Sequence, residues 1–352
     1  MLSREETMYS EFLETELSKI TPVVNTSGSD SAMLDNTLEF MVMNGMELPL
    51  AVMISIPEPW ANNRSMPQNQ KDFYQYYATM MEPWDGPASI LFSDGDIMGA
   101  VLDRNGLRPS RYYVTKDDYL ILSSEVGVLP VDESRILSKD RLKPGKMLLV
   151  DTVAGRLIDD DELKTAYATK QPYGEWLDKN LVHLHDLKIP NKRVPNHTKE
   201  ERAKLQKAFG YSYEDLKTSI LPMALNGAEG IGAMGIDTPL AVLSNQHQPL
   251  FNYFKQLFAQ VTNPPIDSIR EKVVTSTTIY LGESGNVLEE KEENCKMLRI
   301  NNPILTNTDL LKIKNMDVEG FKVETIPITY YKNTSLEKAI DHLYVEADRA
   351  HR

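Results

Sequence analysis

Apolar residues recur every three to four positions along much of the first 81 residues, a period typical of helices with one buried face. The helices predicted on this basis span residues 1–20, 32–44 and 70–81. Pro22 ends the first pattern, and the Ser/Gly turn at residues 26–31 can cap the second helix at its start. Residues 50–56 form an apolar segment between the second helix and the third.

From Ala88 onward the pattern changes to short strands separated by tight turns. The predicted strands span residues 89–92, 97–102, 111–115, 119–123, 147–151 and 156–158. Asp94-Gly95 and Asn105-Gly106 provide turns, because glycine adopts positive φ without steric cost. Short strands that follow one another in this way favour an antiparallel meander over βαβ units.

The second half of the chain alternates helical patterns with loops. The predicted elements are helices at residues 199–209, 213–224, 249–261 and 335–350, a Gly-rich loop at 227–235 and a strand-like stretch at 321–329. Residues 172–199 contain prolines and charges and are expected to connect the two halves. A chain of 352 residues corresponds to about two domains.

Composition narrows the classes of function. The chain has 38 Lys and Arg against 51 Asp and Glu, so its net charge is −13. This charge argues against a nucleic-acid or anionic-membrane partner, because phosphate binding needs clustered cations. No stretch approaches the ~18 apolar residues of a membrane span, and the charged start is not a signal peptide. These features predict a cytoplasmic protein.

Gly230, Gly232 and Gly235 match the G-x-G-x-x-G pattern of dinucleotide-binding loops. That pattern binds phosphate when it follows a strand and opens a helix, whereas here a helix is expected before it and Pro239 follows it. A loop held against another domain is therefore favoured, and nucleotide binding stays open as a weaker alternative.

Two other motifs could carry chemistry. His183 and His185, with Asp186, could be metal ligands, but no third imidazole is near in sequence and a solvated helix edge is favoured. Cys295, the one cysteine of the chain, lies among carboxylates that would raise its thiol pKa, the opposite of what a nucleophile needs. A single cysteine cannot form an internal disulfide or a Cys-ligated cluster.

Asp30 lies between Ser29 and Ser31 in the turn at the expected start of the second helix. Its carboxylate could cap its own helix, or it could bind a ligand. The segments on both sides of the turn favour ligand binding, because they belong to a set of motifs that resemble a known family.

Long motifs, in consecutive order and covering nearly the whole chain, resemble the large subunit of glutamate synthase. The turn around Asp30 begins one of them, and Leu-Asp-Arg-Asn-Gly-Leu-Arg-Pro-Ser-Arg-Tyr at residues 102–112 is another. The matching segments are 28–36, 56–60, 92–95, 102–112, 124–129, 142–151, 232–244 and 253–267. The resemblance implies a sheet hairpin at residues 104–112, near the glutamine pocket.

The resemblance also implies the domains and the fold class. Residues 1–175 are expected to be the C-terminal part of a class II glutamine amidotransferase domain, and residues 176–352 the N-terminal part of the glutamate synthase central domain. The expected fold is α+β and α/β: a partial N-terminal-nucleophile αββα sandwich followed by a partial α/β domain. The chain is thus expected to be a fragment of a longer oxidoreductase.

That family converts L-glutamine, 2-oxoglutarate and a reductant, NADPH or ferredoxin, into two L-glutamates, in glutamate biosynthesis and nitrogen assimilation. The resemblance assigns Asp30 to the α-ammonium of glutamine, with Ser29 and Ser31 flanking it. FMN and an iron–sulfur cluster are expected in domains outside this chain. The family's cysteine nucleophile and oxyanion hole would precede Met1, so this chain alone is expected to be inactive.

The expected partners are L-glutamine, the rest of the large chain or an FMN-domain protein, and a small flavoprotein subunit. Nucleic acid and membrane are not expected. Sheet edges left without their neighbouring strands predict self-association. An alternative function is a non-catalytic scaffold, or a ligand-sensing or interaction module derived from the amidotransferase.

Overall fold

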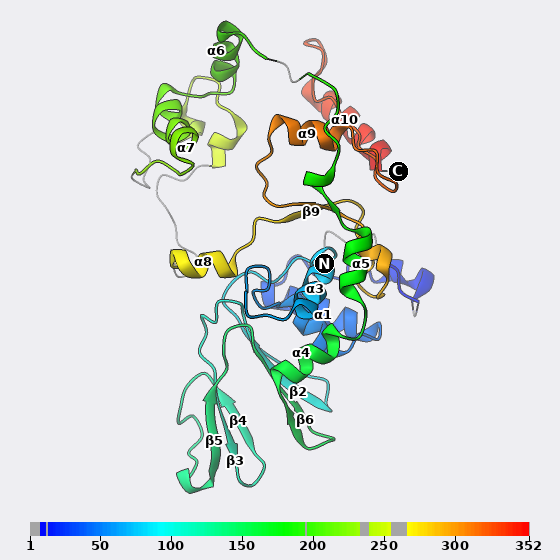
Figure 1. Cartoon of the computed structure of the whole chain (residues 1–352), viewed down its shortest axis with the longest axis vertical. Coiled ribbons are helices and arrows are strands. Elements are labelled where there is room, and N and C mark those ends of the chain that lie inside the picture. The colour runs from blue at the N-terminus through cyan, green and yellow to red at the C-terminus, as the bar shows by residue number, and fades with distance from the viewer. Residues whose placement is uncertain (1–7, 12, 194–195, 233–238, 255–265, 352) are drawn as a thin grey trace. The chain divides into compact units, whose positions relative to one another are not determined.

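Figure 1 shows the computed structural model, which describes residues 8–11, 13–193, 196–232, 239–254 and 266–351. The chain divides into two compact units. The first consists of Met1–Pro190 together with Ile266–Arg352, and the second of Asn191–Pro265. Helices and strands both contribute, in agreement with the predicted mixed fold class. The specific αββα sandwich stays a prediction.

Five helices supply much of the core of the first unit. They are α1 (Asp30–Met43), α2 (Leu48–Ser55), α3 (Gln68–Ala78), α4 (Asp160–Ala168) and α5 (Tyr173–Asn180). Every residue of α2 is buried, which explains why the apolar segment at 50–56 showed no helical period. The ring of Tyr173 on α5 packs against Phe73 and Tyr76 of α3, with ring centroids 5.5 and 5.0 Å away.

Two antiparallel sheets follow α3. Their strands are β1 (Ser89–Ser93), β2 (Ile97–Leu102), β3 (Arg111–Thr115), β4 (Leu120–Ser123), β5 (Ile136–Arg141), β6 (Met147–Asp151) and β7 (Arg156–Ile158). The spatial orders are β1-β2-β6-β7 and β4-β3-β5, and Figure 1 shows β3, β4 and β5 side by side. The predicted strands are confirmed, but the predicted single meander is wrong, because β2 pairs with β6 rather than with β3.

The chain leaves the first sheet at Asp103, directly after β2. The Asp103 side chain is buried, and its carboxylate accepts hydrogen bonds from the backbone amides of Ala88, Asn105 and Gly106 at 2.9–3.2 Å. Gly106 has a φ of 62°, which favours glycine. These bonds form a turn that ends β2. Residues 104–110 therefore link two sheets, and residues 111–112 begin β3, instead of forming the hairpin expected at 104–112.

A short third sheet joins distant segments of the first unit. Its strands, in spatial order, are β8 (Val182–His183), β10 (Leu298–Ile300) and β9 (Ile279–Leu281). Strand β10 runs parallel to β8 and antiparallel to β9. The remaining helices of this unit include α8 (Ser268–Val274), α9 (Asn307–Lys314) and α10 (Leu336–His351). The sheet explains why residues after the second unit pack with the first half of the chain.

The second unit contains helices only, within its described residues. They are α6 (Lys199–Ala208), a π-helix at Asp215–Ile220 that continues into α7 (Leu221–Asn226), and 3₁₀ helices at Ala241–Leu243 and Leu250–Phe254. The predicted helices at 199–209 and 213–224 are thus confirmed. Of the predicted helix at 249–261, residues 255–261 lie outside the described residues.

Other predictions are corrected. The first helix is reduced to a 3₁₀ helix at Glu14–Lys19, and residues 1–7 and 12 lie outside the described residues. The predicted connector contains α5, because Tyr173 and Leu177 bury one face of it. Residues 321–329 are irregular: most of their side chains are exposed, and no described strand pairs with them.

In the part of the chain that the structure describes, no helix has the length and apolar content needed to cross a membrane.

Candidate functional site

Asp30 is the first residue of α1, and Ser29 is the residue that caps this helix. The Ser29 hydroxyl accepts a hydrogen bond of 3.3 Å from the amide of Ala32 and lies 3.1 Å from the Ser31 hydroxyl. The Asp30 carboxylate is exposed and has no hydrogen bond or ion pair with the described residues. The interpretation in which Asp30 caps its own helix is therefore wrong, and its carboxylate is available to a ligand.

Hydrogen bonds accepted by the side chains of two asparagines order the turn before Asp30. The side-chain oxygen of Asn36, in α1, accepts from the amide of Asn25 at 3.1 Å. The side-chain oxygen of Asn25 accepts from the amide and hydroxyl of Ser27 at 3.1 and 2.7 Å. The turn is thus held by α1 itself, in the manner of an Asx-turn. Sequence reasoning had not singled out Asn25.

A buried charge network lies between the loop after α2 and helix α4. The Lys164 ammonium contacts Glu58 Oε1 at 2.6 Å and Asp160 Oδ1 at 2.9 Å, and it donates to the carbonyl oxygen of Gly145 at 2.9 Å. The side chains of Lys164 and Glu58 are only 3% and 7% exposed. The carboxylates of Glu58 and Asp160 balance the charges of Lys164 and of a second lysine, Lys146, as buried ions require.

The charge network raises the pKa of Lys146 and accounts for the glycine at position 145. Burial acts to lower the pKa of Lys146, but its hydrogen bond to Asp160 and the nearby Glu58 outweigh burial, and that pKa is raised. Gly145 has a φ of 65°, and a Cβ there would lie 2.6 Å from Cβ of Glu58. Only glycine permits this approach.

Sequence reasoning missed Lys164, because 106 residues separate it from Glu58. The sequence signal for Glu58 was a charged residue between two prolines in an apolar stretch.

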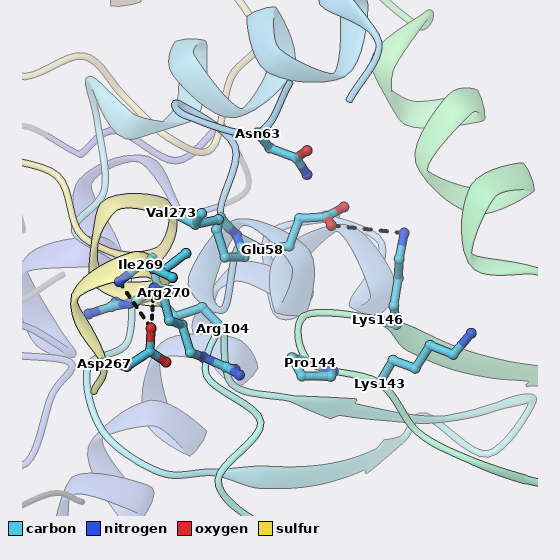
Figure 2. Close-up of a pocket in the computed structure, with 12 residues that line it drawn as sticks. Glu58, Asn63, Arg104, Lys143, Pro144, Lys146, Asp267, Ile269, Arg270 and Val273 are labelled. Carbon is cyan, nitrogen blue, oxygen red and sulfur yellow. Dashed lines mark hydrogen bonds and ion pairs between the residues drawn. The ribbon is translucent and has the colours of Figure 1, made fainter. Parts of the chain in front are cut away.

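A cavity of about 600 Å³ opens beside this network (Figure 2). Its lining combines apolar and charged side chains: Glu58, Pro59, Asn63, Arg104, Lys143, Pro144, Lys146, Asp267, Ile269, Arg270, Val273 and Val274. Figure 2 shows Glu58 directed toward Lys146, 3.9 Å away, and Asp267 accepting from the amides of Ile269 and Arg270. Asp30 does not line this cavity, so the structure does not join the two features.

Cys295 is fully buried. Its sulfur lies 3.2 Å from the carbonyl oxygen of Glu292 and 3.4 Å from that of Trp176. Burial, and secondarily Glu292 and Glu293, raises the pKa of the Cys295 thiol to about 12. The predicted upward direction is confirmed, although burial rather than the carboxylates is its main cause. Cys295 therefore lacks the accessibility and the lowered thiol pKa that a nucleophile needs.

The histidine pair and the Gly-rich loop are the remaining motifs. The rings of His183 and His185 lie 5.3 Å apart, and burial, followed by Arg299, lowers the pKa of His183. Among the described residues, no three His, Cys, Asp or Glu side chains are grouped to hold a metal ion. Helix α7 precedes Gly230 and Gly232, as predicted, while Gly235 lies outside the described residues.

Two family models match the chain. Residues 1–176 match the class-II glutamine amidotransferases, and residues 204–352 match the glutamate synthase central domain. The chain therefore combines a class-II amidotransferase region with a glutamate synthase central-domain region.

Curated relatives agree with this class. The NADPH-type glutamate synthase large chain of Bacillus subtilis is 46% identical over 350 residues, covering 99% of this chain and 23% of the relative. The NADH-type enzyme of Schizosaccharomyces pombe is 42% identical, with 99% and 17% covered, and ferredoxin-dependent glutamate synthase 2 of Synechocystis is 42% identical, with 97% and 22% covered. The chain belongs to the glutamate synthase large-chain family, and it spans about a fifth of the length of these relatives.

Proposed function

We propose that this chain supplies the ammonium-binding half of a glutaminase site, with Asp30 as the group that binds the α-ammonium of L-glutamine. Ser29 and Ser31 flank Asp30 and set the turn that presents its carboxylate. The proposal rests on one observation: Ser29 caps α1, which leaves the Asp30 carboxylate exposed and without a partner among the described residues.

The physical chemistry of the turn supports this role. A carboxylate held in a turn ordered by Asn25 and Asn36 loses little conformational freedom when it binds. A charge-assisted hydrogen bond to an ammonium group contributes about 1.5–3 kcal/mol. A proton transfer is not required of Asp30; its part is to hold the substrate.

The reaction proposed for the whole protein converts L-glutamine, 2-oxoglutarate and a reductant into two L-glutamates. We propose that the FMN and the iron–sulfur cluster of that reaction belong to other domains. The cluster does not fit the residues of this chain, because it needs three or four thiolates and the single cysteine here is buried with a raised pKa. No step of our proposal for this chain passes through either group.

We also propose the division into family domains at residues 175 and 176, which differs from the division into compact units. The proposed partners are the rest of the large chain, or an FMN-domain protein, and a small flavoprotein subunit. A cytoplasmic location is part of the same proposal and rests on the acidic composition and the single cysteine.

The test is a titration of the 352-residue chain, followed by NMR, with L-glutamine and with glutaramate, which keeps the amide and carboxylate but lacks the α-ammonium. We expect Asp30→Asn to weaken L-glutamine binding about 10- to 100-fold and to leave glutaramate binding unchanged. Asp35→Asn is the matched control, since Asp35 is an exposed carboxylate on the same helix. Equal L-glutamine affinity for Asp30→Asn and the unmodified chain, or no saturable binding at all, would overturn the proposal.

A further inference from the structure

A second cavity, of about 330 Å³, lies where the loop after β2 meets the loop before β6 and helix α8. Four of its described lining residues are arginines: Arg108, Arg111, Arg141 and Arg270. None of the described residues that line it is Asp or Glu. Such a concentration of positive charge is unexpected in a chain with a net charge of −13. Arg108, Arg111 and Arg141 are exposed, so their guanidinium groups are accessible to an anion from solvent.

Two of these arginines face each other across paired strands. Arg111 begins β3 and Arg141 ends β5, and they are direct partners in the antiparallel register. Directly opposed residues project from the same face of a sheet, where like charges repel and destabilise the pair. The side chains of Arg108, Arg111 and Arg141 form no ion pair or hydrogen bond with any described residue. The fold thus assembles these charges without supplying a carboxylate to neutralise them.

Buried polar atoms in the same cavity also have no partner. Ser110 is 3% exposed, and its hydroxyl makes no hydrogen bond, nor does Nε of Arg270 or the side-chain oxygen of Asn105. An unpaired buried polar group costs free energy, and native structures normally satisfy such groups. Two of the three are donors that suit an oxyanion, and the Asn105 oxygen suits the proton of a partly protonated one.

We propose that this cavity binds a small multiply charged oxyanion of the phosphate class, free or as the ester of a small molecule. Guanidinium groups bind phosphate in bidentate geometry, and the Ser110 hydroxyl adds a neutral donor. A partly protonated phosphate can both accept from the arginines and donate to Asn105, which a doubly ionised dicarboxylate cannot. A volume of about 330 Å³ suits a ligand of this size. The site is separate from Asp30 and does not depend on the function proposed for it.

The experiment uses the 352-residue chain at low ionic strength and titrates it calorimetrically with inorganic phosphate, with pyrophosphate and with succinate. We expect saturable phosphate binding that Arg111→Gln or Arg141→Gln weakens at least about 10-fold. Lys116→Gln is the matched control: it removes one exposed positive charge just beyond the other end of β3 and should change the affinity less than about twofold.

A second readout does not depend on detecting binding by heat. Without ligand, Arg111→Gln should raise the melting temperature, because it relieves the repulsion from Arg141. With phosphate, the melting temperature should rise for the unmodified chain and not for Arg111→Gln. Ser110→Ala should melt normally and bind phosphate more weakly.

The outcomes separate the alternatives. Succinate binding as tight as phosphate, with the same sensitivity to Arg111→Gln, would overturn the assignment to phosphate and indicate a dicarboxylate. Equal losses for Lys116→Gln and Arg111→Gln would indicate general charge attraction instead of a site. Absence of saturable binding by all three anions, with an unchanged or lower melting temperature for Arg111→Gln, would overturn the proposal altogether.

Discussion

The hydroxyl group of Tyr76 donates a hydrogen bond of 2.7 Å to the carbonyl oxygen of Lys291 and accepts one of 3.0 Å from the amide of the same residue. The two residues are 215 positions apart in the sequence. One buried side chain on α3 therefore satisfies two backbone groups of a segment that lies beyond the second unit. We therefore expect the stability of the first unit to depend on this contact.

We predict that Tyr76→Phe lowers the free energy of unfolding by about 1–3 kcal/mol, because it removes the side-chain partner of two part-buried backbone groups of Lys291. Urea denaturation measures this loss. Tyr119→Phe is the control, since Tyr119 is 63% exposed and its change should stay within about 0.5 kcal/mol. Equal unfolding midpoints for the two variants would contradict the prediction.

Removing the buried cation Lys164 should be more damaging. Lys164→Met is expected to cost about 3–5 kcal/mol, because the carboxylates of Glu58 and Asp160 then lack a buried counter-charge. Lys143→Met, which removes an exposed lysine, should have almost no effect. Adding Glu58→Gln to Lys164→Met should restore part of the loss. If the double variant is less stable than Lys164→Met, the charge imbalance is not the cause.

The buried thiol of Cys295 should make the free energy of unfolding depend on pH in the alkaline range. Its thiol pKa is raised to about 12 in the folded state, mainly by burial, against about 8.5 in an unfolded chain. The unfolded state therefore loses the proton first. The stability contribution is complete below about pH 8.5 and declines as the pH rises toward about 12, by up to about 1.4 kcal/mol per pH unit. Urea midpoints measured from about pH 7.5 upward should show this decline relative to Cys295→Ala.

The 352-residue chain should not release ammonia from L-glutamine above the rate in buffer. A thiol nucleophile must be accessible and ionised, whereas the single cysteine is buried with a raised pKa. A coupled glutamate dehydrogenase assay detects released ammonia. Ammonia release that Asp30→Ala abolishes would show that another group serves as the nucleophile.

Self-association is expected through the sheet β4-β3-β5, because no described strand covers the outer edge of β5. Leu137 on β5 is 67% exposed, and Leu137→Lys should shift the chain toward the monomer in concentration-dependent light scattering. Val153→Lys places the same charge on an exposed turn and should leave the oligomeric state unchanged. A monomer at every concentration would contradict this prediction.

Sequence patterns identified elements whose signals are local. The strands around Asp94-Gly95 were predicted correctly because a glycine turn and short apolar runs are determined by neighbouring residues. Helix α2 was recognised only as an apolar segment, since a helix buried on all sides has no polar face to mark its period. The helix cap was assigned ambiguously, because Ser29 and Asp30 are both good capping residues.

The sequence by itself determined the family, the turn that carries Asp30, the positions of most strands and the upward direction of the Cys295 thiol pKa. Only the tertiary structure decided that β2 pairs with β6, that Lys164 meets Glu58 and that Arg111 lies opposite Arg141. Motifs and turns depend on residues close together in the chain. Pairing and buried charge depend on residues about 30 to more than 100 positions apart, which are brought together only when apolar burial offsets the entropy of closing the intervening loops.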